Sequence, residues 1–215
     1  MNSVYVIDYI YKLPLIDFSQ VSILNLLNVH PITDGNIRGH AYGVISKIVE
    51  VNPNVKIIFI PINLTSTSED IIYILNYILQ NGNGSIINLS FGFKNIHFMN
   101  ELHELIKKLI NKGMYIICSD GNINDVVYPA HFKEVITINS SKFNKNSIDI
   151  NNNIIFLDRS LFLKVLWIDN KCFYTSDSSF YTALASGVAS LMNSKDFDLA
   201  SLYKNIIERT KLNVQ

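Results

Sequence analysis

Short apolar runs recur along this chain, and segments with the periodicity of a helix separate them. The runs lie at 4–7, 55–60, 85–89, 114–118 and 135–138. They are apolar throughout rather than alternating, which is typical of strands that are buried on both faces. Such strands, when helices come between them, form a parallel sheet covered on both sides. We therefore predict an α/β fold, a three-layer sandwich of a mostly parallel sheet with helices on both faces.

The helical segments are recognised by the spacing of their apolar residues. In 69–79, Ile71, Ile74 and Ile78 recur on one face, and Ser68 stands before them in the position of a cap. The same reasoning predicts further helices at 41–49, 102–109, 179–192 and 198–208.

The rest of the chain adds two expectations and no boundary between domains. Two apolar runs within 154–174 are expected to form a hairpin or edge strands, and the Asn-rich stretch 144–153 a surface loop. No stretch resembles a linker, so we expect the 215 residues to form one domain, 1–215.

Composition excludes several classes of protein. The chain is 48% hydrophobic and 17% charged, which is the balance of a folded protein rather than a disordered one. Its 18 basic and 18 acidic residues cancel, whereas a protein that binds nucleic acid by neutralising phosphates has a basic excess. Nucleic acid is therefore not an expected partner.

The cysteines and the lengths of the apolar runs indicate the cellular compartment to expect. Cys118 and Cys172 lie in apolar runs and are expected to be small buried side chains, not a disulfide framework. Asp8 interrupts the first run before it reaches the length of an export signal. No run approaches the roughly 18 apolar residues of a membrane helix. We expect a cytoplasmic protein with no membrane contact and, if the chain is the full product, no pro-segment.

Four polar residues stand where a parallel sheet places its functional sites, at strand ends and helix starts. Asp8 and Asn122 each follow an apolar run, and His40 and Ser179 each open a predicted helix. Taken singly, each has an ordinary interpretation as a cap or a turn residue. Together they supply an acid, a base, a nucleophile and an oxyanion donor, which is the set that serine peptidase chemistry requires.

The order of these residues points to one family. Asp8, His40 and Ser179 follow one another as Asp, His, Ser, which is the order found in subtilisin. The chain resembles subtilisin-like serine peptidases in further segments, in the correct order from residue 4 to about 192. They are the Asp-bearing strand, the helix after the His, the Ile-Asn-x-Ser-x-Gly strand, the Gly-Asn loop, the Tyr-Pro-Ala segment and the nucleophile helix, at 4–8, 40–46, 86–92, 119–122, 128–138 and 178–189.

The resemblance implies a subtilisin-like fold and a role for each residue. Asp8 would orient His40, which would act as general base and then as general acid, and Ser179 would be the nucleophile. The side chain of Asn122 and the backbone N–H of Ser179 would form the oxyanion hole. A peptide or protein substrate would bind as an extended strand, along the substrate-binding residues Ser90, Phe91, Gly92, Ser119, Asp120 and Gly121.

Two carboxylates suggest a specificity. Asp120 and Asp125 lie near the segment that would contact the residue before the scissile bond, and they favour a basic residue there. The alternative is that both carboxylates point into solvent or into the loop.

The chain departs from the family pattern close to the site. Asp177 stands where the family has Gly and places a negative charge two residues before Ser179. Behind the catalytic His, Ala41 replaces a Gly and Gly43 replaces a second His. None of these changes removes a catalytic group.

The alignment around His40 has an alternative register. Matching Gly43 to a later Gly of the family would move the base position to Ile37 and leave no triad. We prefer His40 because it keeps Val44 and the following helix in phase.

No metal or cofactor is expected. Segment 49–54 runs straight into the next strand, where the family often has an inserted calcium loop, and no carboxylate cluster has calcium-loop spacing. Without calcium or a disulfide, the protein is expected to be less robust than a secreted relative.

Three hypotheses about function follow. The first is an active serine endopeptidase, with narrow specificity by analogy with small relatives that trim leader peptides. The second is a catalytically weak or inactive peptidase that binds peptides, and the third is an unrelated α/β protein whose triad is accidental. Retention of all four catalytic groups favours the first, whereas Asp177 and the small size favour the second.

Overall fold

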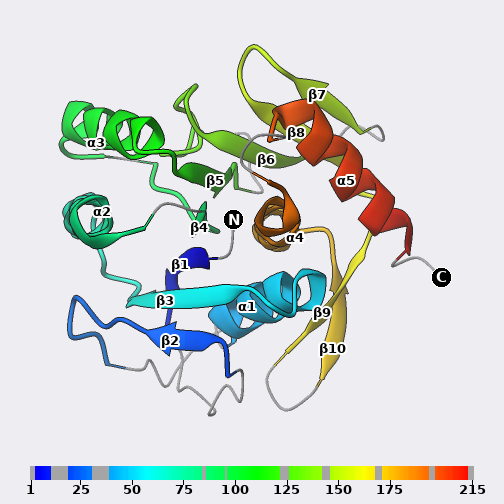
Figure 1. Ribbon diagram of the computed structural model, residues 1–215, viewed down its shortest axis with the longest axis horizontal. Helices are drawn as coiled ribbons and strands as arrows, with labels where there is room; N and C mark the ends of the chain where they lie inside the picture. Colours follow the sequence, from blue (N-terminus) through cyan, green and yellow to red (C-terminus); the bar gives the residue numbers. More distant parts are fainter. Residues whose placement is uncertain are drawn as a thin grey trace.

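The structure is a computed structural model that describes residues 3–10, 19–30, 39–83, 86–94, 96–121, 126–141, 146–167, 171–193 and 197–212. Its centre is an eight-stranded sheet (Figure 1) with the order β2 (Val21–Ile23), β3 (Lys56–Ile62), β1 (Ser3–Tyr9), β4 (Ile86–Leu89), β5 (Tyr115–Ser119), β6 (Ile136–Ser141), β8 (Ile154–Asp158) and β7 (Ser147–Asp149). Neighbouring strands are parallel except for β7 and β8. The predicted mostly parallel sheet is therefore confirmed.

The described residues form five helices, which pack on the two faces of the sheet (Figure 1). One face carries α2 (Ser68–Asn81) and α3 (Met99–Asn111), and the other carries α1 (His40–Val51), α4 (Ser178–Leu191) and α5 (Leu199–Leu212). The helices predicted from apolar spacing are all present, and the three-layer arrangement is confirmed.

Strand β1 shows why the apolar runs lack alternation. Val4 and Val6 join the core beneath α1, α4 and α5, whereas Tyr5 and Ile7 join the core beneath α2 and α3. All four are at most 7% exposed. Because successive side chains of a strand point to opposite faces, a strand between two helical layers is apolar at every position.

Helix α2 begins differently from the prediction. Thr67, not Ser68, is the N-cap, and its side chain accepts a hydrogen bond from the Asp70 backbone N–H while the Asp70 side chain accepts one from the Thr67 N–H. Thr67 has the extended backbone that a cap requires, whereas Ser68 is already helical and buried. At the other end, the helix stops at Gly82.

The later strands divide between two sheets. A separate hairpin of β9 (Leu163–Leu166) and β10 (Cys172–Thr175) packs on α1, as expected for part of 154–174, but β8 joins the main sheet beside β6. The predicted loop at 144–153 contains β7, so that prediction was wrong for 147–149. Both β7 and β2 are three residues long, too short to show a period in sequence.

The two cysteines have different surroundings. Cys118 is buried as predicted, but Cys172 is exposed, so that prediction was wrong. Cys172 opens β10, which pairs with β9 alone among the described strands, and a two-stranded sheet leaves part of its surface uncovered. No helix in the described part of the chain is long and apolar enough to span a membrane.

Candidate active site

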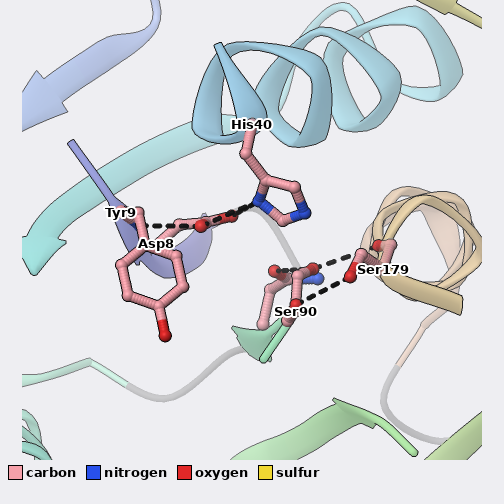
Figure 2. Close-up of polar contacts among 6 residues, drawn as sticks. Asp8, Tyr9, His40, Ser90 and Ser179 are labelled. Carbon is pink, nitrogen blue, oxygen red and sulfur yellow. Dashed lines mark hydrogen bonds and ion pairs between the residues drawn. The ribbon is translucent and has the colours of Figure 1, made fainter. Parts of the chain in front are cut away.

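Asp8 and His40 form a hydrogen-bonded pair near the carboxyl end of β1 (Figure 2). The Nδ1 atom of His40 lies 2.9 Å from Asp8 Oδ1 and 3.0 Å from Asp8 Oδ2. Asp8 Oδ1 also accepts a hydrogen bond of 2.7 Å from the backbone N–H of Tyr9. The Asp8 side chain is 0% exposed and the His40 side chain 20%. The carboxylate is thus shielded from water, while the ring reaches the surface.

The pairing decides which nitrogen of neutral His40 carries the proton. An ionised carboxylate only accepts hydrogen bonds, so Nδ1 is the donor and Nε2 keeps its lone pair. Figure 2 shows the ring between Asp8 and α4, with its second nitrogen turned toward the side where Ser179 lies. An imidazole held in this way can take a proton from a group on α4.

A single glycine lets the chain place His40 there. Gly39 is the N-cap of α1 and has a φ of 84°, in the left-handed region that glycine adopts without strain. The chain turns at this residue, and His40 becomes the first residue of the helix.

Several effects act on the pKa of His40. Burial lowers it, but the charge of Asp8, the hydrogen bond to Asp8 and the charge of Asp177 raise it, and the net result is a pKa above the usual value. His40 therefore accepts a proton more readily than a histidine in water, and it is neutral only at correspondingly higher pH.

Ser179 is the second residue of α4 and faces the end of β4. Its Oγ donates a hydrogen bond of 2.8 Å to the backbone carbonyl of Ser90 (Figure 2). Because a hydroxyl has one proton, it does not at the same time donate to His40, and transfer to His40 requires the hydroxyl to rotate away from Ser90. Its backbone N–H belongs to the first helical turn, whose N–H groups have no acceptor within the helix.

Buried hydrogen bonds connect α4 to the ends of β4 and β5. The Asn88 side chain donates to Ser186 Oγ at 2.9 Å, and the hydroxyls of Ser119 and Ser178 are 2.6 Å apart. Ser119 Oγ also accepts from the Gly121 N–H at 3.2 Å. The residue before the proposed nucleophile is therefore linked through Ser119 to the loop that follows β5.

Residues 32–211 of the chain match a family model described as "Subtilase family". The chain belongs to the subtilase family. His40 and Ser179 lie within the matched range, whereas Asp8 precedes it. No curated protein sequence matches the chain.

Solved structures agree with this fold. A cold-adapted subtilisin-like serine proteinase is 20% identical, with a TM-score of 0.69 over 94% of this chain and 79% of that chain. The prenylagaramide maturation protease PagA is 17% identical, with a TM-score of 0.68 over 97% of this chain and 94% of that one. The PatG macrocyclase in complex with peptide is 15% identical, with a TM-score of 0.70 over 92% of this chain and 78% of that chain. At these identities the likeness concerns the fold alone.

This subtilase has an aromatic cluster where the family has a second His. A Cβ at Gly43 would lie 2.8 Å from Cε1 of Phe180 and 3.1 Å from Cζ3 of Trp167, so these rings occupy the space. Phe180 also packs against His40, with ring centroids 5.3 Å apart. His40 is thus held by Asp8 at Nδ1 and by Phe180 against its ring.

The predicted substrate-binding residues occupy the ends of β4 and β5. Ser90, Phe91 and Ser119 are buried, whereas Gly92 is exposed. Within the described chain, the backbones of Phe91 and Gly92 form no hydrogen bond to another residue. The pairing resumes at Phe93, which exchanges two backbone hydrogen bonds with Tyr128.

Of the polar side chains predicted near this edge, Asp120 lies within the described residues. Asp120 is half-buried and accepts a hydrogen bond from the Asn139 side chain, and burial raises the pKa of its carboxyl against the opposing effects of Asn139 and His131. Asn122 and Asp125 lie outside the described residues, as does Ile37 of the alternative register. Gly121 has a φ of 72°.

Asp177 fits its position without strain. It is the N-cap of α4 with extended backbone, φ −71° and ψ 136°, so the Gly of the family pattern is not required there. Its carboxylate lies near His40 and contributes to the raised pKa of that ring. Among the described residues, no group of three or more His, Cys, Asp and Glu side chains is placed to hold a metal ion.

Sequence reasoning missed the buried network beneath α4. Its signal was present, since Ser178, Thr182, Ser186 and Ser190 recur every four residues in a helix of mostly small and apolar residues, and all four are buried. Polar residues at that spacing on a buried helix need partners on the surface that they face. The aromatic residues of the hairpin gave no comparable signal.

Ser119 and Ser140 form a matched pair for testing this network. Ser119→Ala removes a partner of Ser178 and the acceptor of the Gly121 N–H, and we expect it to lower the free energy of unfolding by about 1–2 kcal/mol. Ser140→Ala is expected to cost nothing, because the buried Ser140 hydroxyl has no partner within the described chain. Urea unfolding of both variants measures the difference, and equal stabilities would contradict the role given to Ser119.

Asp177 offers a test of the electrostatics at His40. Its charge raises the pKa of His40, so Asp177→Asn lowers that pKa and keeps His40 neutral to lower pH. The rate at which a fluorophosphonate labels Ser179 is measured against pH, and the acid limb of this pH profile is expected to move to lower pH. Glu208→Gln, an exposed change on α5, serves as the control. A profile that stays with the control would show that Asp177 does not act on His40.

Proposed function

We propose that this protein is a serine endopeptidase that uses Asp8, His40 and Ser179 as its triad. The observation that carries the proposal is the hydrogen bond of 2.9 Å between the buried Asp8 carboxylate and His40 Nδ1. It leaves Nε2 as a base beside the helix that presents Ser179, in a chain that belongs to the subtilases.

The reaction follows from the chemistry of these groups. Ser179 Oγ attacks the carbonyl carbon of the scissile bond as His40 Nε2 takes its proton. His40 then gives that proton to the leaving amine, the C–N bond breaks, and an ester on Ser179 remains. A water molecule attacks the ester while His40 again acts as base, and the acid product leaves as the proton returns to Ser179.

Two further elements complete the proposed site. Charge on the tetrahedral intermediate would be stabilised by the backbone N–H of Ser179, at the N-terminus of α4, and by the side chain of Asn122. The substrate would add as a strand along residues 90–92, and the backbone groups of Phe91 and Gly92, which have no hydrogen-bond partner within the described chain, support this mode.

We propose a narrow specificity, such as the removal of a leader from one peptide. The similarity to structures described as maturation proteases supports it. Indiscriminate cutting of denatured casein would argue against this part of the proposal.

A second candidate function is that of a peptide-binding protein with little turnover. The hydrogen bond from Ser179 to Ser90, in place of one to His40, favours it, as does the charge of Asp177 close to the nucleophile.

A fluorophosphonate probe separates the two functions. We expect labelling at Ser179, mapped by mass spectrometry, that is absent in Ser179→Ala and retained in Ser176→Ala, a change three residues away. Loss of Ser or His costs subtilisin on the order of 10⁶ in kcat, and a comparable loss is expected for Ser179→Ala. A folded sample that remains unlabelled would favour the peptide-binding function.

A further inference from the structure

A pocket of about 500 Å³ opens beside His40. Its wall consists of three aromatic side chains, those of Trp167, Phe173 and Phe180, and Lys171 and Asp177 also line it. The lining residues belong to the β9–β10 hairpin, the start of α1 and the start of α4, three elements that are labelled in Figure 1. None of its lining residues comes from the ends of β4 and β5, where the predicted substrate-binding residues lie.

The aromatic wall is built by packing. Phe173 stands edge-on to Trp167, with centroids 5.0 Å apart, and to Phe180, with centroids 5.5 Å apart. The hairpin that carries two of these rings packs on α1, where the buried Ser46 hydroxyl lies 3.0 Å from the Leu166 carbonyl of the hairpin and 2.9 Å from the Gly43 carbonyl, its other acceptor. Such a wall exists before a ligand arrives, which is typical of small-molecule and side-chain sites.

We propose that this pocket binds an aromatic or large aliphatic side chain from the leaving part of the substrate, and this rests on the proposed function. His40 must deliver its proton to the leaving amine, so the peptide that follows the scissile bond begins next to His40. Phe180 follows the proposed nucleophile directly and joins His40 to the aromatic wall. The first large side chain beyond the scissile bond therefore meets an apolar wall.

The chemistry of the pocket selects against other side chains. A charged group would lose water against three ring surfaces, and the charged residues among the described lining, Asp177 and Lys171, have opposite charges that do not favour either sign. A glycine or alanine would leave the wall uncovered. Filling such a pocket is worth roughly 10–200-fold in selectivity for small changes of apolar size, and exchanging Phe for Gly is expected to reach that range.

The protein contains its own reporter of occupancy. Trp167 is the single tryptophan of the chain, so its fluorescence reports on this pocket alone. The inactive Ser179→Ala protein is titrated with phenylalaninamide, leucinamide and glycinamide, which resemble the start of a leaving peptide. We expect saturable fluorescence changes with the first two and at least tenfold weaker binding of glycinamide.

Variants of the hairpin provide the matched comparison. Phe173→Ala in the Ser179→Ala background is expected to weaken phenylalaninamide at least tenfold, whereas Tyr174→Ala, which removes a neighbouring ring that is 65% exposed, leaves it unchanged. Trp167→Phe is expected to abolish the signal. Equal affinity for glycinamide and phenylalaninamide in the Ser179→Ala protein overturns the proposal without requiring any variant of the pocket to fold.

The two proposals fail in different ways. Fluorophosphonate labelling of Ser179 in the wild type, with no preference among the amides, leaves the peptidase standing and refutes the pocket. Selective binding of phenylalaninamide without labelling refutes the peptidase and retains the pocket as a site for a side chain.

Discussion

A buried carboxylate is the constraint on which this site depends. Asp8 has no contact with water, and an ionised group in that position is costly unless it is paired and hydrogen-bonded. His40 Nδ1 and the Tyr9 N–H supply those partners. Their geometry requires β1 inside the sheet, between β3 and β4, and α1 starting beside its end, which the left-handed turn at Gly39 permits.

Close packing of α4 brings the remaining groups to this pair. A Cβ at Gly187 would lie 2.8 Å from Cβ of Val51, so the lack of a side chain at Gly187 lets α4 approach α1 directly. These two helices carry Ser179 and His40. Hydrogen bonds from Asn88 and Ser119 then fix α4 over the ends of β4 and β5. Helix packing and a buried polar network thus bring the proposed base, the proposed nucleophile and the proposed substrate-binding edge into one region.

Sequence alone predicted the layers of the fold, which the structure confirms, and it proposed a set of site residues, of which Asp8 and His40 are hydrogen-bonded. A strand buried on both faces is apolar at every position, and Asp8 stands at its end. What it could not predict depends on contacts between distant segments. The exposure of Cys172 follows from a hairpin outside the main sheet, and the strand β7 is too short for a period. Gly43 looked like a loss of the family's second His, yet Phe180 and Trp167 fill that space.

The state of the His40 ring tests the account most directly. Nitrogen-detected NMR of the wild type and of Asp8→Asn, with His40→Gln to assign the signal among the five histidines, gives its tautomer and its pKa. The account predicts a neutral ring protonated at Nδ1 and a pKa above that of an ordinary histidine, which falls in Asp8→Asn. A His40 that titrates like a histidine in water, and does so equally in both proteins, would contradict it.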